Sequence, residues 1–85
     1  MYEIEWQPKA YRQLKKIKER ETLAAIRDAV FDLANWPHCR NVTALKNRQS
    51  GYRLRVGGWR VLFEVQNRIR IILIQEVKKR DEQTY

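Results

Sequence analysis

The sequence is poor in the residues that build metal centres and disulfides. It has one cysteine, Cys39, and one histidine, His38, among 85 residues. A lone cysteine excludes an intrachain disulfide and a cysteine zinc site, and it fits the reducing cytosol. His38 has no further partners at metal-ligand spacing, so we expect a surface histidine and a site that uses neither a metal nor another cofactor.

Glycine, proline and long apolar runs are also scarce. Three glycines and two prolines, with 44% hydrophobic residues, are typical of a folded globule and not of a disordered chain. No apolar run approaches the ~18 residues of a membrane span, and the chain does not open with a basic segment followed by an apolar one. We therefore expect a single cytoplasmic domain over residues 1–85 without membrane contact.

Acidic residues are in the minority. Eighteen Lys and Arg against ten Asp and Glu give a formal net charge of +8 and a pI near 10.1. For a domain of this size, such an excess predicts a polyanionic partner, either nucleic acid or an acidic protein. A P-loop, a GxGxxG loop and an HExxH motif are all absent, which leaves the basic residues as the main candidates for chemistry.

The residues that are present divide into short elements. Alternation over residues 2–7 predicts a strand that ends at Pro8. Apolar residues at helical spacing then predict two helices, the first very basic, the second with Thr22 as its N-cap and its end before Pro37. Residues 38–50 have no period and are expected to form a surface loop. The apolar helix faces comprise Tyr11, Leu14 and Ile17, and then Leu23, Ile26, Val30 and Leu33.

The most informative segment is a hairpin centred on Gly57-Gly58. Alternating runs flank these glycines, and a type I′ turn favours glycine at both central positions because φ is positive there. The register places Arg55 opposite Arg60, with Arg53 two residues along on the same side. The apolar side, expected to pack on the helices, consists of Tyr52, Leu54, Val56, Trp59, Val61 and Phe63.

The facing arginines require an explanation, because like charges directly opposite on paired strands destabilise a sheet. An anion is the simplest one. The guanidinium fork suits phosphate, and a rigid sheet holds such a site in place. The alternative is an ordinary solvated face, although such a surface would more readily alternate the signs of its charges.

A second hairpin, turning through residues 66–68, would bring the last strand beside the first hairpin. It pairs Val65 with Ile69 and places Ile72 and Ile74 on the arginine side. Continued alternation brings further residues to that side, namely Glu76, Lys78 and Arg80.

Together, these segments resemble the RelE/ParE superfamily of type II toxins. The resemblance covers almost the whole chain: the order of the elements, a Leu-Lys pair at residues 45–46, the hairpin of residues 52–63 and the terminal residues 80–85. It implies an α+β fold of order β-α-α-β-β-β. Two N-terminal helices would pack on one face of a small antiparallel sheet, and the opposite, concave face would be functional.

The RelE branch of the superfamily implies an activity. Its members cleave mRNA in the ribosomal A site, using basic residues of the two hairpin strands, an arginine after the last strand and often a nearby tyrosine. Attack of the RNA 2′-OH on the adjacent phosphate needs a proton acceptor, a proton donor and charge stabilisation, but no metal. By position, the candidate catalytic residues are Arg53, Arg55, Arg60, Arg80 and Tyr85.

The resemblance also implies individual roles. Arg55 and Arg60 would clamp phosphate, and Arg80 would stabilise the leaving group or the transition state. Tyr85 is the candidate base, because surrounding cations favour the phenolate, and Lys78 is the alternative base. RNA and ribosome binding without sequence readout is expected from Lys46, Arg48, Lys78 and Lys79.

Other functions remain open. A ParE-like protein would inhibit DNA gyrase by binding it, without catalysis, and the two branches share much of the hairpin. A nucleic-acid-binding module without activity is a third interpretation, disfavoured by the lack of an exposed aromatic stacking platform. A toxin also implies a cognate antitoxin as partner, beside mRNA and the ribosome. Its acidic, partly disordered segment could wrap the basic face or the apolar groove between helices and sheet.

Overall fold

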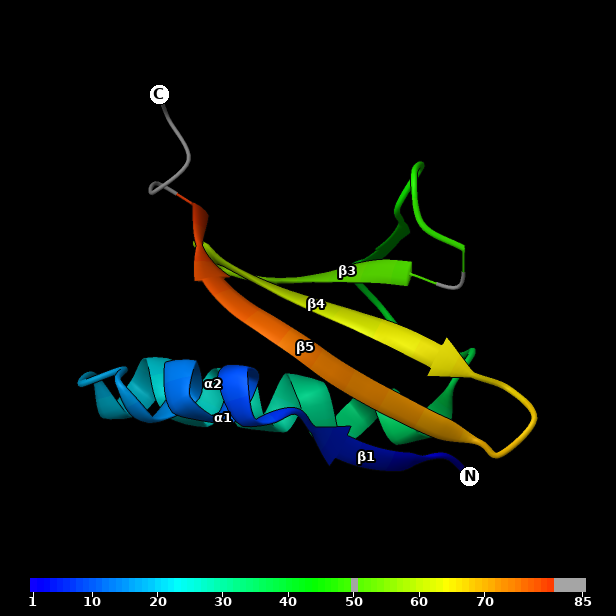
Figure 1. The fold of residues 1–85 in the computed structure, drawn as a ribbon. Helices are drawn as coiled ribbons and strands as arrows, with labels where there is room; N and C mark the ends of the chain where they lie inside the picture. Colours follow the sequence, from blue (N-terminus) through cyan, green and yellow to red (C-terminus); the bar gives the residue numbers. More distant parts are fainter. Residues whose placement is uncertain (50, 81–85) are drawn as a thin grey trace.

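Two helices pack on one face of a five-stranded sheet (Figure 1). This computed structural model describes residues 1–49 and 51–80. The elements are β1 (Glu3–Trp6), α1 (Pro8–Lys15), α2 (Arg20–Phe31), the 3-10 helix η1 (Asp32–Asn35), β2 (Val42–Ala44), β3 (Gly51–Val56), β4 (Trp59–Gln66) and β5 (Ile71–Lys79). The predicted α+β class and element order are confirmed, with η1 and β2 as additions.

The last strand lies inside the sheet, whose order is β1-β5-β4-β3-β2. β1 runs parallel to β5, so that Glu3 pairs with Ile71 and Trp6 with Ile74, whereas the other strand pairs are antiparallel. The sheet is therefore mixed, and not antiparallel throughout as the sequence predicts. The prediction missed this pair because almost the whole chain separates β1 from β5, so no tight turn sets their direction.

Helix α1 covers the edge of β5 where β1 stops. Pro8 occupies the first turn of α1, where its missing N–H leaves no hydrogen bond unmade. Further along the helix, Gln13 Oε1 accepts a 2.7 Å hydrogen bond from the backbone N–H of Val77. A side chain of α1 thereby accepts a hydrogen bond from a backbone N–H of β5 that lies beyond the end of β1.

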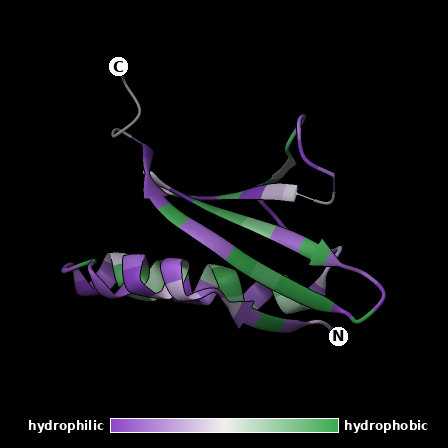
Figure 2. Cartoon of the chain, viewed as in Figure 1, coloured by the Kyte–Doolittle hydropathy of each residue, from purple (hydrophilic) through white to green (hydrophobic). Residues whose placement is uncertain are grey.

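The hydrophobic core lies between the helices and the sheet. Phe63 is fully buried there, and its ring centroid lies 5.7 Å from those of Trp36 and Tyr52. Figure 2 shows that β5 is hydrophobic beside β1 and more hydrophilic toward its other end. The buried apolar residues are Ala10, Leu14, Ile17, Ile26, Val30, Leu33, Leu54, Val61, Phe63, Val65, Ile72, Ile74 and Val77. None of the described helices is long and apolar enough to span a membrane.

The β4–β5 turn differs from the prediction. It comprises the four residues 67–70, and Arg70 adopts a left-handed φ of 56° that is unusual for a residue with a side chain. Val65 consequently pairs with Ile72 and not with Ile69. The prediction that Ile72 lies on the arginine side is therefore wrong, and so is that for Ile74, because both residues are buried in the core.

Two predicted boundaries also differ. Helix α2 begins at Arg20 with Glu19 at the N-cap, whereas Thr22 lies inside the helix and donates a 2.9 Å hydrogen bond to Glu19 Oε1. The segment expected to be a loop contains β2, in which Val42 pairs with Leu54 of β3. A strand of three residues is too short to give a recognisable alternation.

Candidate functional site

The β3–β4 hairpin holds its arginines as the sequence predicts. Arg55 pairs with Arg60, and the neighbouring Val61 is buried against the helices, so the two arginines point away from the core. The turn itself differs from the predicted type I′. Gly57 has φ +58°, but Gly58 lies outside the left-handed region, which a type I′ turn requires at both positions.

A row of three cations crosses three strands on the face that points away from the helices. Arg55 of β3 pairs with Arg60 of β4, and Arg60 pairs with Lys78 of β5. These three residues are termed the cationic row. The adjacent row across the same strands consists of Arg53, Leu62 and Glu76. The structure thus brings Lys78 together with the predicted hairpin arginines.

Lys78 reaches the cationic row through a β-bulge. Gln75 has no partner in β4, because its two neighbours in β5 pair with the consecutive residues Leu62 and Phe63. The extra residue reverses the alternation of β5, so that Glu76 and Lys78 return to the arginine side. Simple alternation predicts the same side for these two residues only because two errors cancel. The longer turn and the bulge each reverse the alternation of β5, and together they restore it.

Arg60 is the member of the row with a buried donor. Its Nε is shielded from solvent and has no hydrogen-bond partner among the described residues, whereas Arg55 is exposed. An unpaired buried donor costs about 1–3 kcal/mol, and the like charges across the strands add repulsion. A bound anion would relieve the repulsion between the facing cations, and the arginine fork matches phosphate oxygens. The row therefore has the chemistry of a phosphate site.

One carboxylate lies beside the cationic row. Glu76 Oε2 accepts a 2.8 Å hydrogen bond from Nζ of Lys9 in α1, and Glu76 Oε1 lies 3.7 Å from Nζ of Lys78. The hydrogen bond from Lys9, aided by the positive charge of Lys78, holds the pKa of Glu76 below its ordinary value, although burial opposes this shift. Glu76 is therefore ionised at neutral pH and links α1 to the row.

We expect Glu76→Gln to lower the stability in a pH-dependent way. Because the folded-state pKa of Glu76 is below its unfolded value of about 4.3, the carboxylate stabilises the fold above that pH. This contribution is lost as the pH falls through the folded-state pKa. At pH 7 the substitution should cost about 1 kcal/mol, or roughly 4–8 °C in the Tm of a thermal unfolding curve. In acid the two curves should converge, and an equal difference in Tm at every pH would contradict the prediction.

The structure describes two further predicted residues at the end of β5, Lys79 and Arg80. Lys79 points to the opposite side, where its Nζ is 6.0 Å from the ring centroid of Trp59. Arg80 is exposed, and its backbone N–H donates a 2.8 Å hydrogen bond to the carbonyl of Gly58, which holds the end of β5 at the hairpin turn. The predicted base, Tyr85, lies outside the described residues.

The two predicted cations before β3 differ in how they are held. Lys46 is exposed, whereas Arg48 donates a hydrogen bond from Nη2 to the side-chain Oε1 of Gln75 at the bulge. Gly51 permits this approach, because a Cβ at that position would lie 2.9 Å from Cβ of Arg48. Arg48 is therefore anchored across the sheet, and Lys46 is not part of the cationic row.

Residues that commonly build other kinds of site lie elsewhere. His38 is exposed, and no three His, Cys, Asp or Glu side chains gather as a metal site among residues 1–49 and 51–80. Burial, and to a smaller extent the charge of Asp32, raises the pKa of the Cys39 thiol, which makes it a weaker nucleophile. Neither residue contributes to the cationic row.

Sequence reasoning assigned no function to the α1 residues that meet β5. Lys9 and Gln13 are four residues apart and therefore share one face of the helix. That spacing is the signal by which these two residues could be found in the sequence. Nothing in the sequence shows that this polar face meets the strand edge, because the parallel pairing that brings α1 there was not predicted.

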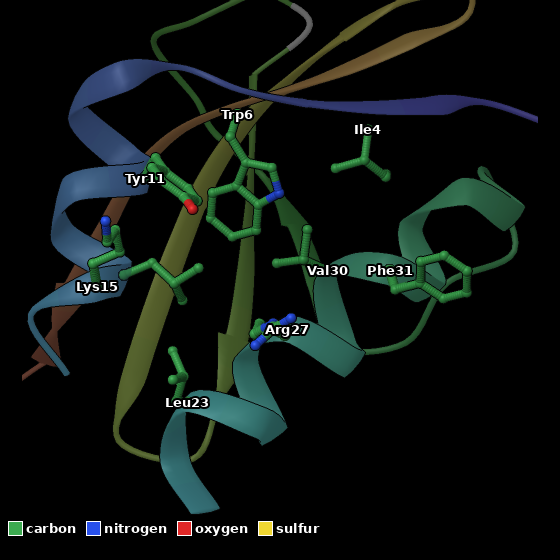
Figure 3. Close-up of a pocket in the computed structure, with 9 residues that line it drawn as sticks. Ile4, Trp6, Tyr11, Lys15, Leu23, Arg27, Val30 and Phe31 are labelled. Carbon is green, nitrogen blue, oxygen red and sulfur yellow. The ribbon is translucent and has the colours of Figure 1, made fainter. Parts of the chain in front are cut away.

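An apolar groove lies on the helical side of the molecule, between α1, α2 and β1 (Figure 3). Its volume is about 550 Å³. Phe31 is 73% exposed at one end, and Tyr11, which belongs to the apolar face predicted for the first helix, is 50% exposed on α1. Two cations, Lys15 and Arg27, border the apolar surface. The remaining lining residues are Ile4, Trp6, Leu14, Leu23 and Val30.

The fold is that of RelE-like toxins. The RelBE2 toxin-antitoxin complex of Mycobacterium tuberculosis contains a chain that is 27% identical, with a TM-score of 0.79 over 93% of this chain and 98% of that chain. A RelE-RelB complex from Pyrococcus horikoshii gives 21% identity and a TM-score of 0.80, covering 93% and 94%. The YoeB dimer of Staphylococcus aureus gives 17% identity and a TM-score of 0.74, covering 91% and 94%.

The sequence identifies the family more narrowly. Residues 4–84 match the family described as the ParE toxin of the type II toxin-antitoxin system parDE. The chain therefore belongs to this family, within the RelE/ParE superfamily, and is a toxin of a type II toxin-antitoxin system. By sequence, no curated protein matches the chain.

Proposed function

We propose that this toxin is a metal-independent endoribonuclease that cleaves mRNA in the ribosomal A site and thereby inhibits translation. The observation that carries the proposal is the cationic row, in which Arg60 keeps a buried Nε without a partner among the described residues. A rigid sheet that holds three cations in line is preorganised for a phosphate. The RelE-like fold adds support.

The reaction would proceed by attack of the RNA 2′-oxygen on the adjacent phosphorus, with loss of the 5′-oxygen. Arg55 and Arg60 bind the non-bridging oxygens and stabilise the charge of the phosphorane, and Arg53 adds a cation in the adjacent row. Arg80, held near the hairpin turn, is assigned to the leaving 5′-oxygen. Lys78, whose Nζ lies 3.7 Å from Glu76 Oε1, is assigned to phosphate binding, and Tyr85 remains the proposed base.

The surrounding cations would hold the RNA and the ribosome. Lys46, Arg48 and Lys79 are assigned to phosphate contacts that do not read sequence, so binding should weaken steeply with salt. The proposed substrate places the toxin in the cytoplasm.

The second candidate function is inhibition of DNA gyrase by binding, without catalysis. The match to the ParE family favours it. In this case the basic face would dock on an acidic or nucleic-acid surface of the gyrase–DNA complex, and no bond of the RNA would break.

One experiment separates the two functions. Purified toxin is added to translating ribosomes and the mRNA 5′ ends are mapped, while a supercoiling assay with gyrase runs in parallel. The ribonuclease proposal expects cuts at fixed positions within codons and normal supercoiling. Intact mRNA together with inhibited gyrase would overturn it in favour of the second function.

We propose that the cognate antitoxin docks an amphipathic, acidic segment in the groove between α1 and α2. The groove offers apolar surface bordered by Lys15 and Arg27, on a chain of net charge +8, so it fits apolar side chains flanked by carboxylates. The similar chain from M. tuberculosis forms a complex with an antitoxin. Docking would cover the exposed Phe31 and Tyr11.

We expect Phe31→Ala to weaken antitoxin binding about tenfold without lowering the Tm. The ring is 73% exposed in the free toxin, so its loss leaves the core intact and removes apolar area only from the complex. Titration calorimetry with the antitoxin measures the change. Ile69→Ala is the matched control, because Ile69 is 63% exposed at the β4–β5 turn, outside the groove. Equal losses in both variants would exclude the groove as the docking site.

A further inference from the structure

We propose that Glu76 is a positioning residue, which holds Lys78 in the cationic row so that the ammonium meets the reacting phosphate beside Arg60. The inference rests on the proposed ribonuclease function, because it takes that phosphate to belong to RNA. It concerns a carboxylate to which neither the sequence nor the family resemblance assigned a role.

Lys78 needs a constraint to remain in the row. It lies directly opposite Arg60, whose positive charge repels it, and its side chain is 43% exposed. A lysine side chain has four rotatable bonds and is strongly hydrated, so repulsion alone would turn its ammonium toward solvent. An opposite charge on the same face is the simplest means of keeping it in place.

Glu76 supplies that charge from a fixed position. It lies two residues before Lys78 on the same side of β5, and its Oε1 is 3.7 Å from Lys78 Nζ. Its other oxygen, Oε2, is held by the 2.8 Å hydrogen bond from Lys9. The Glu76 side chain is only 18% exposed, so its conformation is restricted from two directions. The chain of contacts runs from α1 through the carboxylate to the cationic row.

A second carboxylate on the same face shows what distinguishes Glu76. Glu64 lies on the arginine side of β4, opposite Gly51 and Leu73, and forms no ion pair with any described residue. Glu64→Gln therefore removes the same charge from the same face without touching Lys78. It is the matched control for Glu76→Gln.

The first test measures single-turnover cleavage of ribosome-bound mRNA. We expect Glu76→Gln to lower the cleavage rate about tenfold with little change in the affinity for the ribosome, because a misplaced group affects the reaction more than binding. Glu76→Asp should recover part of the rate, and Glu64→Gln should cleave like the unmodified toxin. Adding Glu76→Gln to Lys78→Met should cause no further loss, because the two side chains act as one unit.

A structural role alone predicts different results. If Glu76 only links α1 to β5, Glu76→Gln should lower the Tm as Lys9→Met does and leave the cleavage rate unchanged. Either unchanged cleavage or additive losses would overturn the proposal.

The second test does not depend on ribonuclease activity. Nitrogen-15 NMR of the lysine ammonium groups in the free toxin reports the order of Lys78. We expect Glu76→Gln, but not Glu64→Gln, to lower that order, and an unchanged Lys78 signal would overturn the proposal. Failure of the proposed ribonuclease function would instead appear as absence of cleavage by the unmodified toxin. Because the NMR measurement does not require cleavage, the two failures can be told apart.

Discussion

Arg60→Ala is expected to lower the cleavage rate of ribosome-bound mRNA by about 100- to 1,000-fold. Removal of one preorganised donor from a site that stabilises transition-state charge typically has an effect of this size. Arg60 is the central member of the cationic row and the one with a buried Nε that lacks a partner among the described residues. Single-turnover kinetics with mapping of 5′ ends would measure the loss.

The same substitution should leave the fold intact. It removes a repulsive charge between Arg55 and Lys78, so the Tm should be unchanged or higher. Arg60→Lys keeps the charge but lacks the planar fork and should recover only part of the rate. Arg68→Ala is the control, because it removes one exposed positive charge at the β4–β5 turn. A similar loss in that variant would mean that net charge, and not the row, determines activity.

Phe63→Ala is expected to lower the free energy of unfolding by about 3–5 kcal/mol. The side chain is fully buried and its ring packs on those of Trp36 and Tyr52, so truncation leaves a cavity beside these two rings. Because the total stability of small domains is about 5–15 kcal/mol, such a loss takes a large part of it. Urea denaturation at 25 °C should show a much lower midpoint with a similar slope.

The only other phenylalanine provides the control. Phe31→Ala makes the same chemical change at a side chain that is 73% exposed, and it should shift the unfolding free energy by less than about 0.5 kcal/mol. If both variants were equally destabilised, the core assigned to Phe63 would be wrong. Comparison of the two variants thus separates the effect of burial on stability from the effect of residue type.

The hairpin shows how much of the candidate site is encoded locally. Two glycines between alternating runs fix which residues face each other, so the pairing of Arg55 with Arg60 could be predicted from the sequence alone. The type of turn could not, because glycine tolerates several turn geometries. Fold class was also predictable, since the helical and strand periods are distinct along the chain.

The last strand shows where such reasoning ends. A left-handed Arg70 lengthens the turn, and a bulge at Gln75 shifts the alternation back. Neither arginine nor glutamine is typical of such conformations, so the sequence does not predict them. The contacts of Glu76 with Lys9 depend in turn on the parallel pairing of β1 with β5. Long-range pairing of this kind is set by packing of the whole domain and not by local propensity.

The place of β5 inside the sheet has a consequence for synthesis. As the nascent chain leaves the ribosome, β1 appears before β5 (residues 71–79), which is its strand neighbour among the described residues. Until β5 follows, one side of β4 is unpaired, the core lacks Ile72 and Ile74, and the cationic row has two members in place of three. The described domain therefore cannot close before β5 has left the ribosome.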